Sequence, residues 1–211
     1  MTIEKLFSFR VEFSIKCPRC DRSVPINGPM ELIHCDYCQT DIPITKEYVV
    51  ETLSEACTDM QETDIGTGFG WMRYGAFSGN LTLARLDPYC VQCKTDFASP
   101  WDLRPGSSYS CTKCGAAYPV DSPPAFLKEG LPGVKYLINA LLSSQTSSAL
   151  SGSSPVVLAC PSCGASLSVD GTTRFVDCNY CNSQVYLPDD LWLRFHSVRK
   201  KRRWFVICEY A

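Results

Sequence analysis

The chain has 211 residues, a formal net charge of −2 and 14 cysteines. It contains no run of about 18 apolar residues, so we do not expect a membrane-spanning helix. Residues 1–13 alternate charged and aromatic side chains, unlike the apolar centre of a secretory signal. Thiols that stay available to metal belong in a reducing compartment, and we therefore expect a cytoplasmic protein.

The first predicted element is a half-buried strand over residues 6–16. Polar side chains there alternate strictly with an apolar set, as expected for a strand with one face on a core. The apolar set is Phe7, Phe9, Val11, Phe13 and Ile15. This strand leads directly into the first cysteine pair.

Twelve cysteines form six Cys-x-x-Cys pairs, and the pairs fall into three couples with 14, 17 and 14 residues between the partners. The couples are Cys17/Cys20 with Cys35/Cys38, Cys90/Cys93 with Cys111/Cys114, and Cys160/Cys163 with Cys178/Cys181. This spacing is typical of four-cysteine zinc sites, in which two tight turns (knuckles) each present two thiolates. We predict three structural Zn²⁺ ions, with iron, disulfides and redox-active dithiols as alternatives.

The first and third cysteine groups belong to two copies of one unit. At a constant offset of 143 residues, the cysteines align without a gap, and so do several apolar positions. The dipeptides Asn27-Gly28 and Asp170-Gly171 predict equivalent two-residue hairpin turns. Each copy is therefore predicted to run knuckle, strand, tight turn, strand, knuckle, third strand.

Other elements are predicted between these copies. Residues 46–61 have helical spacing, and residues 64–86 suggest a hairpin that turns at 78–80. The second cysteine group has a longer loop, with Trp101 expected near its tip. A short helix is predicted over 132–142. The segment 143–154 contains seven serines and has the composition of a flexible linker.

The remaining candidates are few. We expect Cys57 and Cys208 to be buried small apolar residues, and neither His34 nor His196 to bind metal. The basic run 199–203 is interpreted as a solvated strand end, with contact to phosphates as the alternative and with Trp204 and Phe205 available for stacking. Three sites of four thiolates and Zn²⁺ would add −6 to the formal charge, giving about −8, which disfavours generic nucleic-acid binding.

Three segments resemble the zinc-ribbon family of four-cysteine zinc-β-ribbons: Cys17-Pro18-Arg19-Cys20, Cys111-Thr112-Lys113-Cys114-Gly115 and Cys160-Pro161-Ser162-Cys163-Gly164. In that family Gly commonly follows the second knuckle cysteine. Asp21 and Lys94 depart from this pattern, so we expect a slightly different geometry at those two knuckles.

The resemblance implies three zinc-β-ribbons. Together with the elements predicted between them, we expect a small, metal-stabilised, mainly β protein with short helices and a β-rich insert between ribbons one and two. The expected domains are ribbon one with its N-terminal strand (1–48), the helix and insert (49–86), ribbon two with a short helix (87–142), the serine-rich linker (143–154) and ribbon three with a basic and aromatic tail (155–211).

The expected function is that of a non-enzymatic adaptor or complex subunit that acts through protein–protein contacts. Thiolates fill every metal position, and with two histidines and no phosphate loop or catalytic triad, nothing in the sequence favours an enzyme or a small-molecule substrate. The alternatives are a nucleic-acid-binding accessory factor that uses the C-terminal basic segment, with weak binding expected, and a non-catalytic subunit of an enzyme complex.

Overall fold

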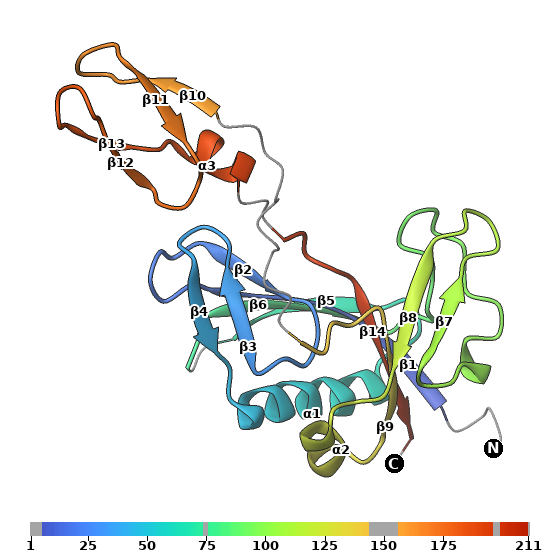
Figure 1. The fold of residues 1–211 in the computed structure, drawn as a ribbon. Coiled ribbons are helices and arrows are strands. Elements are labelled where there is room, and N and C mark those ends of the chain that lie inside the picture. Colours follow the sequence, from blue (N-terminus) through green and yellow to red (C-terminus); the bar gives the residue numbers. More distant parts are fainter. Residues whose placement is uncertain (1–5, 74–75, 144–155, 196–198, 211) are drawn as a thin grey trace. The chain divides into compact units, whose positions relative to one another are not determined.

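The computed structural model describes residues 6–73, 76–143, 156–195 and 199–210 (Figure 1). The chain is mainly β, and it divides into two compact units. The first comprises residues 1–35, 40–144 and 200–211, and the second comprises 36–39 and 145–199. The predicted linker 143–154 lies, apart from Ser143, outside the described residues. Among the described residues, no helix is long and apolar enough to cross a bilayer.

The elements follow one another in a β-rich order. The strands are β1 (Leu6–Lys16), β2 (Ser23–Ile26), β3 (Leu32–Cys35), β4 (Thr40–Pro43), β5 (Gly68–Arg73), β6 (Gly79–Ala84), β7 (Ser107–Ser110), β8 (Ala117–Asp121), β9 (Val134–Ile138), β10 (Val156–Ala159), β11 (Ser166–Val169), β12 (Phe175–Asp177), β13 (Gln184–Tyr186) and β14 (Trp204–Glu209). The helices are α1 (Lys46–Glu62), α2 (Ala125–Gly130) and α3 (Asp189–Phe195), and a 3₁₀ turn, η2, covers Pro100–Asp102.

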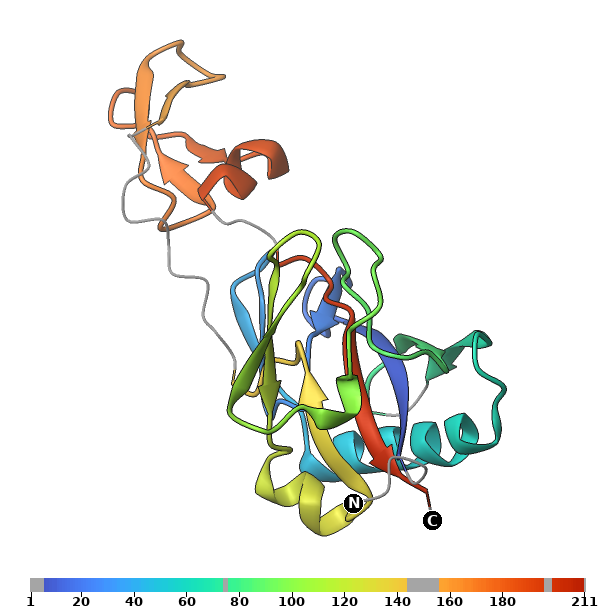
Figure 2. The same cartoon turned by 90° about the vertical axis from the view of Figure 1, so that its right-hand side faces the viewer.

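The first unit is built on an antiparallel sheet with the strand order β5-β6-β1-β14-β9-β8-β7, and β2 pairs with β1 off this path. The predicted strand 6–16 is confirmed as β1, which pairs with β2, β6 and β14. Figure 2 shows β14 between β1 and β9. We had assigned this segment to the C-terminal tail of ribbon three. It instead forms β14, an inner strand of the sheet of the first unit.

The predicted short helix over 132–142 is wrong, because Val134–Ile138 forms strand β9. Its apolar residues fit a helical stripe, but Val134, Tyr136, Leu137 and Ile138 are all buried, as in an inner strand that is covered on both faces. A short apolar run of this kind cannot be assigned by its periodicity alone. The helix in this region lies earlier, at α2, after Pro124.

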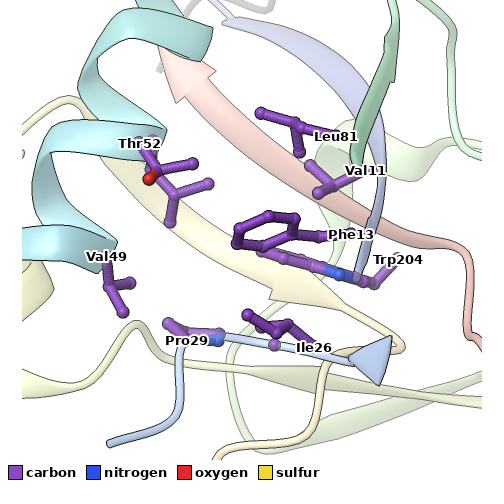
Figure 3. A pocket seen from close by; sticks show the side chains of 10 residues that line it. Val11, Phe13, Ile26, Pro29, Val49, Thr52, Leu81 and Trp204 are labelled. Atoms are coloured by element: carbon purple, nitrogen blue, oxygen red, sulfur yellow. The ribbon is translucent and has the colours of Figure 1, made fainter. Parts of the chain in front are cut away.

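The helix predicted over 46–61 is confirmed as α1, which ends one residue later, at Glu62. Thr45 caps it, since its side-chain oxygen accepts a hydrogen bond of 3.3 Å from the Tyr48 N–H. Figure 3 shows Val49 and Thr52 of α1 on the side of the helix that faces Phe13 and Trp204 of the sheet. These residues line a small hollow of about 20 Å³. The helix thus covers the part of β1 that leads into the first knuckle.

The predicted hairpin over 64–86 forms from β5 and β6, but its turn lies earlier than expected. Arg73 pairs with Gly79, so Gly79 and Asn80 belong to β6 instead of to the turn. Gly79 lies against the backbone oxygen of Ser14, where a Cβ atom would approach to 2.8 Å. The glycine that suggested a turn is therefore needed for close packing between β6 and β1.

Candidate metal centres

The structure brings the twelve predicted cysteine ligands together in three groups of four. Within each group, the Sγ atoms all lie within 4.8 Å of one another. The groups are Cys17, Cys20, Cys35 and Cys38; Cys90, Cys93, Cys111 and Cys114; and Cys160, Cys163, Cys178 and Cys181. We refer to the segments that carry them as ribbons one, two and three.

The distances between sulfurs fit a tetrahedral metal. Ligands at about 2.3 Å from a central zinc ion would be separated by about 3.8 Å along each edge of the tetrahedron. Sulfurs from opposite knuckles lie close to this value: 3.7 Å for Cys20–Cys35, 3.5 Å for Cys90–Cys114 and 3.7 Å for Cys163–Cys178. The four sulfurs of each group can therefore hold one metal ion, with all four positions filled by protein.

All six knuckles share one backbone feature, which corrects the expectation that two of them differ. The residue directly after the second cysteine of each pair has a left-handed φ of 55° to 75°. These residues are Asp21, Gln39, Lys94, Gly115, Gly164 and Asn182. Asp21 (57°) and Lys94 (63°) thus adopt the conformation of the glycines, in a region that costs most side chains free energy.

The hairpins of ribbons one and three turn at the knuckles, so the predicted two-residue turns at Asn27-Gly28 and Asp170-Gly171 are wrong. Strand β1 pairs with β2 across the first knuckle, and β3 pairs with β4 across the second. Ribbon three repeats this with β10–β11 and β12–β13. Because each knuckle closes a hairpin, four cysteines from two hairpins meet at one point.

The two glycines in those dipeptides serve different purposes. A Cβ atom on Gly28 would lie 2.1 Å from the backbone oxygen of Leu141, whose N–H donates to the carbonyl of Asn27. Gly171 has a φ of 76°, and its Cβ would lie 2.5 Å from the ring of Phe195. Of the two glycines, Gly171 therefore has the positive φ that a two-residue Asn-Gly or Asp-Gly hairpin turn requires, and Gly28 does not.

In ribbon two, Tyr118 stabilises a thiolate at Cys90. Its hydroxyl lies 3.1 Å from the Cys90 Sγ and accepts a 3.0 Å hydrogen bond from the Val91 N–H. Burial tends to raise the pKa of Cys90, but hydrogen bonds from Tyr118 and the Cys93 backbone outweigh this and lower the pKa to about 6. The Ala116 N–H lowers the pKa of Cys114, but the hydrogen bond shared with Cys90, together with burial, raises it to about 12.

Ribbon three has the same division of charge. Burial again opposes ionisation of Cys160, but the backbone N–H groups of Ser162 and Cys163 lower its pKa to about 6. The Ala165 N–H lowers the pKa of Cys163, yet the hydrogen bond with Cys181 raises it to about 12. Each of these two groups thus combines a thiolate with a thiol, and a metal that binds all four as thiolates must displace a proton.

We did not predict from the sequence that side-chain hydroxyl groups would hydrogen-bond to the cysteine sulfurs. Thr95 lies 3.3 Å from the Cys93 Sγ and Ser183 lies 2.7 Å from the Cys181 Sγ, and these hydrogen bonds lower the pKa of both cysteines. A Ser or Thr two residues after the last cysteine of a knuckle is the signal that could have revealed them.

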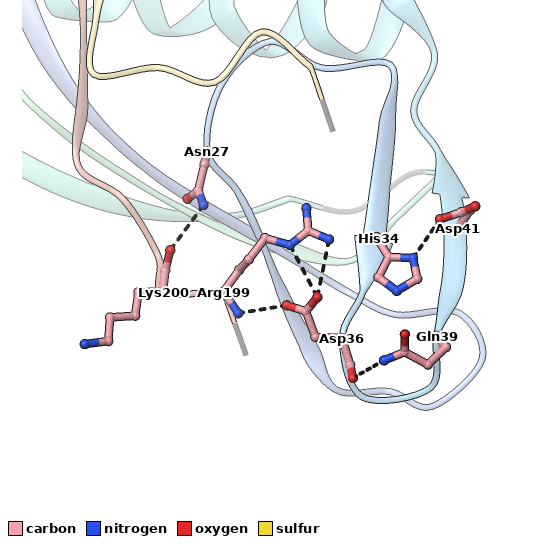
Figure 4. Close-up of polar contacts among 7 residues, drawn as sticks. All are labelled: Asn27, His34, Asp36, Gln39, Asp41, Arg199 and Lys200. Atoms are coloured by element: carbon pink, nitrogen blue, oxygen red, sulfur yellow. Dashed lines mark hydrogen bonds and ion pairs between the residues drawn. The ribbon is translucent and has the colours of Figure 1, made fainter. Parts of the chain in front are cut away.

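His34 lies outside the first group of ligands. Its Nδ1 lies 2.8 Å from the Oδ1 of Asp41. Figure 4 shows the two side chains pointing toward each other. His196, the other histidine, falls outside the described residues. In the same region the buried carboxylate of Asp36 accepts hydrogen bonds from the backbone N–H of Arg199 (2.8 Å) and from its guanidinium (3.3 Å) (Figure 4).

The basic run 199–203 is largely occupied by contacts within the protein. Besides Arg199, the Arg203 guanidinium pairs with Glu12 at 3.0 Å and the Arg202 guanidinium donates to the Asn139 side chain at 3.4 Å. The expectation that Trp204 and Phe205 are available for stacking is wrong, since both are buried in β14. Lys200 and Lys201 remain exposed.

Comparison of the chain with protein-family models, with curated proteins and with solved structures finds no match. The chemistry of the three cysteine groups and the surfaces around them are therefore the basis for a function.

Proposed function

We propose that the protein is a non-enzymatic zinc-binding adaptor or complex subunit, in which three structural Zn²⁺ ions hold the ribbons in shape. Four thiolates are the preferred ligands of structural zinc, and a tetrahedral site that is filled by protein leaves no position for water or substrate. The distances of 3.5–3.7 Å between sulfurs support this choice of metal and geometry.

The observation that carries the adaptor role is the exposure of large apolar side chains on ribbon three. Phe175 is 54% exposed, Tyr180 77% and Tyr186 49%, and the rings of Phe175 and Tyr186 contact each other at 5.4 Å. Their counterparts in ribbon one, 143 positions earlier, are Leu32, Tyr37 and Pro43. Aromatic side chains of this kind are enriched at protein interfaces, so we propose that ribbon three binds a protein partner.

The nucleic-acid alternative depended on Trp204 and Phe205 for stacking against bases. Both side chains are buried and cannot stack in this way. Two exposed lysines would neutralise few phosphates, and three anionic metal centres would oppose binding at long range. A fluorescence titration with mixed-sequence DNA and RNA tests this directly. Submicromolar binding that persists at about 0.2 M salt would favour the nucleic-acid role over the adaptor role.

The adaptor role is tested by affinity purification from the native host with quantitative mass spectrometry. We expect a defined set of partners with the wild-type chain, and its loss with Tyr180→Ala and with Phe175→Ser. Ile65→Ser is the matched control, because Ile65 is 72% exposed but lies in the first unit. Partners that are retained by both ribbon-three variants, or no enriched partner at all, would contradict the proposal.

A further inference from the structure

Two cysteines outside the metal groups meet in the first unit. Cys57 lies on α1 and Cys208 on β14, 151 residues apart in the sequence, and their Sγ atoms are 3.2 Å apart. The sequence predicted both as buried small apolar residues. Cys208 is buried, with 2% of its surface exposed, whereas Cys57 is only partly buried.

The pair does not have the features of a fourth metal centre. Its sulfurs are closer together than the 3.5–3.7 Å found across the three cysteine groups. Among the described residues, neither cysteine belongs to a cluster of three or more metal-ligating side chains. A disulfide bond has a length of about 2.05 Å, so the sulfurs need to approach by about 1.2 Å to form one.

Solvent can reach this pair from one side. Both cysteines line a hollow of about 170 Å³, whose wall also includes Ser54 and Thr58 of α1. A molecule as small as hydrogen peroxide fits this volume. Hydrogen bonding with Cys57 and burial raise the pKa of Cys208, and they outweigh the positive charges of Arg85 and Lys135, which lower it.

We propose that Cys57 and Cys208 form a reversible redox site that takes hydrogen peroxide as its oxidant and closes to a disulfide between α1 and β14. The Cys57 thiolate attacks one oxygen of the peroxide, the O–O bond breaks, and the departing hydroxide takes a proton to become water. The Cys208 sulfur then attacks the sulfenic acid at Cys57, its proton passes to solvent, and the departing hydroxide becomes a second water. Two thiols thus lose two electrons, which a dithiol reductant returns.

The surroundings assign the order of these steps. The hydrogen bond with Cys57, together with burial, raises the pKa of Cys208 well above its usual value, so Cys208 remains a thiol. The more exposed Cys57 meets the oxidant first, and Cys208 closes the bond from the interior. Since the bond would tie a helix to an inner strand of the sheet, it restricts the unfolded chain over a long loop.

The test uses the zinc-loaded full chain and stoichiometric hydrogen peroxide, followed by non-reducing tryptic mass spectrometry. Trypsin isolates Cys57 in peptide 47–73 and Cys208 in peptide 204–211, and each peptide has no other cysteine. We expect these two peptides to become linked, two thiols to be lost, and the zinc content to stay unchanged. Thermal unfolding should shift upward by on the order of 5 °C, and dithiothreitol should reverse the shift.

Cys57→Ser is the control variant, because Cys57 is partly exposed and its replacement leaves the core of the sheet intact. This variant should show neither the crosslink nor the thermal shift. The proposal is wrong if peroxide releases zinc and oxidises the three cysteine groups while peptides 47–73 and 204–211 stay unlinked. It is also wrong if wild type and Cys57→Ser respond to peroxide with the same thermal shift.

Discussion

Ribbons one and three are one module in two settings. At the offset of 143, Phe13 pairs with Ile26 as Val156 pairs with Val169, and Ile33 pairs with Ile42 as Val176 pairs with Val185. The offset extends to the helices, since α1 begins at Lys46 and α3 begins at Asp189. The local register is therefore the same, and what differs is the surrounding structure.

The setting differs most at the first strand. In ribbon one, β1 has 11 residues and also pairs with β6 and β14. In ribbon three, β10 has four residues and, among the described residues, pairs with β11. Val157 of β10 is 68% exposed, whereas its counterpart Ser14 is 7% exposed. A module that is built into a large sheet can draw on burial for stability, whereas a small module depends on its metal.

The largest expected effect comes from removing one ligand in each setting. Cys178→Ser should unfold ribbon three entirely, because the free energy of binding structural zinc, about 10–16 kcal/mol, is folding free energy in so small a unit. Cys35→Ser should release one zinc but leave β1 paired with β6 and β14. Hydrogen exchange with mass spectrometry distinguishes the two outcomes. Equal loss of protection in both ribbons would contradict the comparison.

The two glycines offer a second contrast. Gly28→Ala should destabilise the first unit by about 3 kcal/mol, because its Cβ would collide with the backbone of Leu141. Gly171→Ala should cost about 2 kcal/mol through its positive φ and should displace Phe195 of α3. Denaturant unfolding measures both values. A smaller cost for Gly28→Ala than for Gly171→Ala would contradict this account of the two positions.

Glycine introduced at a knuckle should be stabilising. Lys94→Gly and Asp21→Gly each relieve a side chain at a left-handed φ, and we expect a gain of about 1 kcal/mol in thermal or chemical unfolding. Lys113→Gly is the matched control, since Lys113 also lies within a knuckle but its φ is not positive. A loss of stability in both test variants would show that the side chains contribute more than the backbone strain costs.

The smallest effect is one of pH on the metal-free ribbons. The pKa values of Cys90 and Cys160 are lowered to about 6 from 9.0, so their contribution to stability is complete above pH 9 and is lost as the pH falls through about 6. The raised pKa values of Cys114 and Cys163, about 12, act in the opposite direction, so their contribution to stability is complete below pH 9 and is lost as the pH rises through about 12. Zinc binding at neutral pH should therefore release protons, and calorimetry in buffers of different ionisation enthalpy measures their number. Binding heats that do not depend on the buffer would contradict this.

Much of the site, and less of the fold, could be predicted from the sequence. The twelve ligands followed from spacing, because a knuckle needs only local backbone geometry. Strand β1 and helix α1 followed from periodicity. The place of β14 in the sheet could not be predicted, because its pairing with β9 joins residues far apart in the chain. Strand β9 was not predicted either, because a continuous apolar run fits a strand or a helix equally well.

The Asn-Gly and Asp-Gly dipeptides were misleading for a related reason. Gly28 is required by the backbone of Leu141, more than 100 residues later, and no local pattern records such an approach. The contact between Cys57 and Cys208 was missed in the same way, because it depends on β14 entering the sheet beside β1. Predictions failed where the chain meets itself over long distances.

The central claim is that three groups of four cysteines each bind one zinc ion. Plasma emission analysis of the protein, purified without added metal or chelator, tests it most directly. We expect three zinc ions per chain, falling to two in Cys35→Ser and in Cys178→Ser. A content of one metal ion or none per chain, or iron in place of zinc, would contradict it.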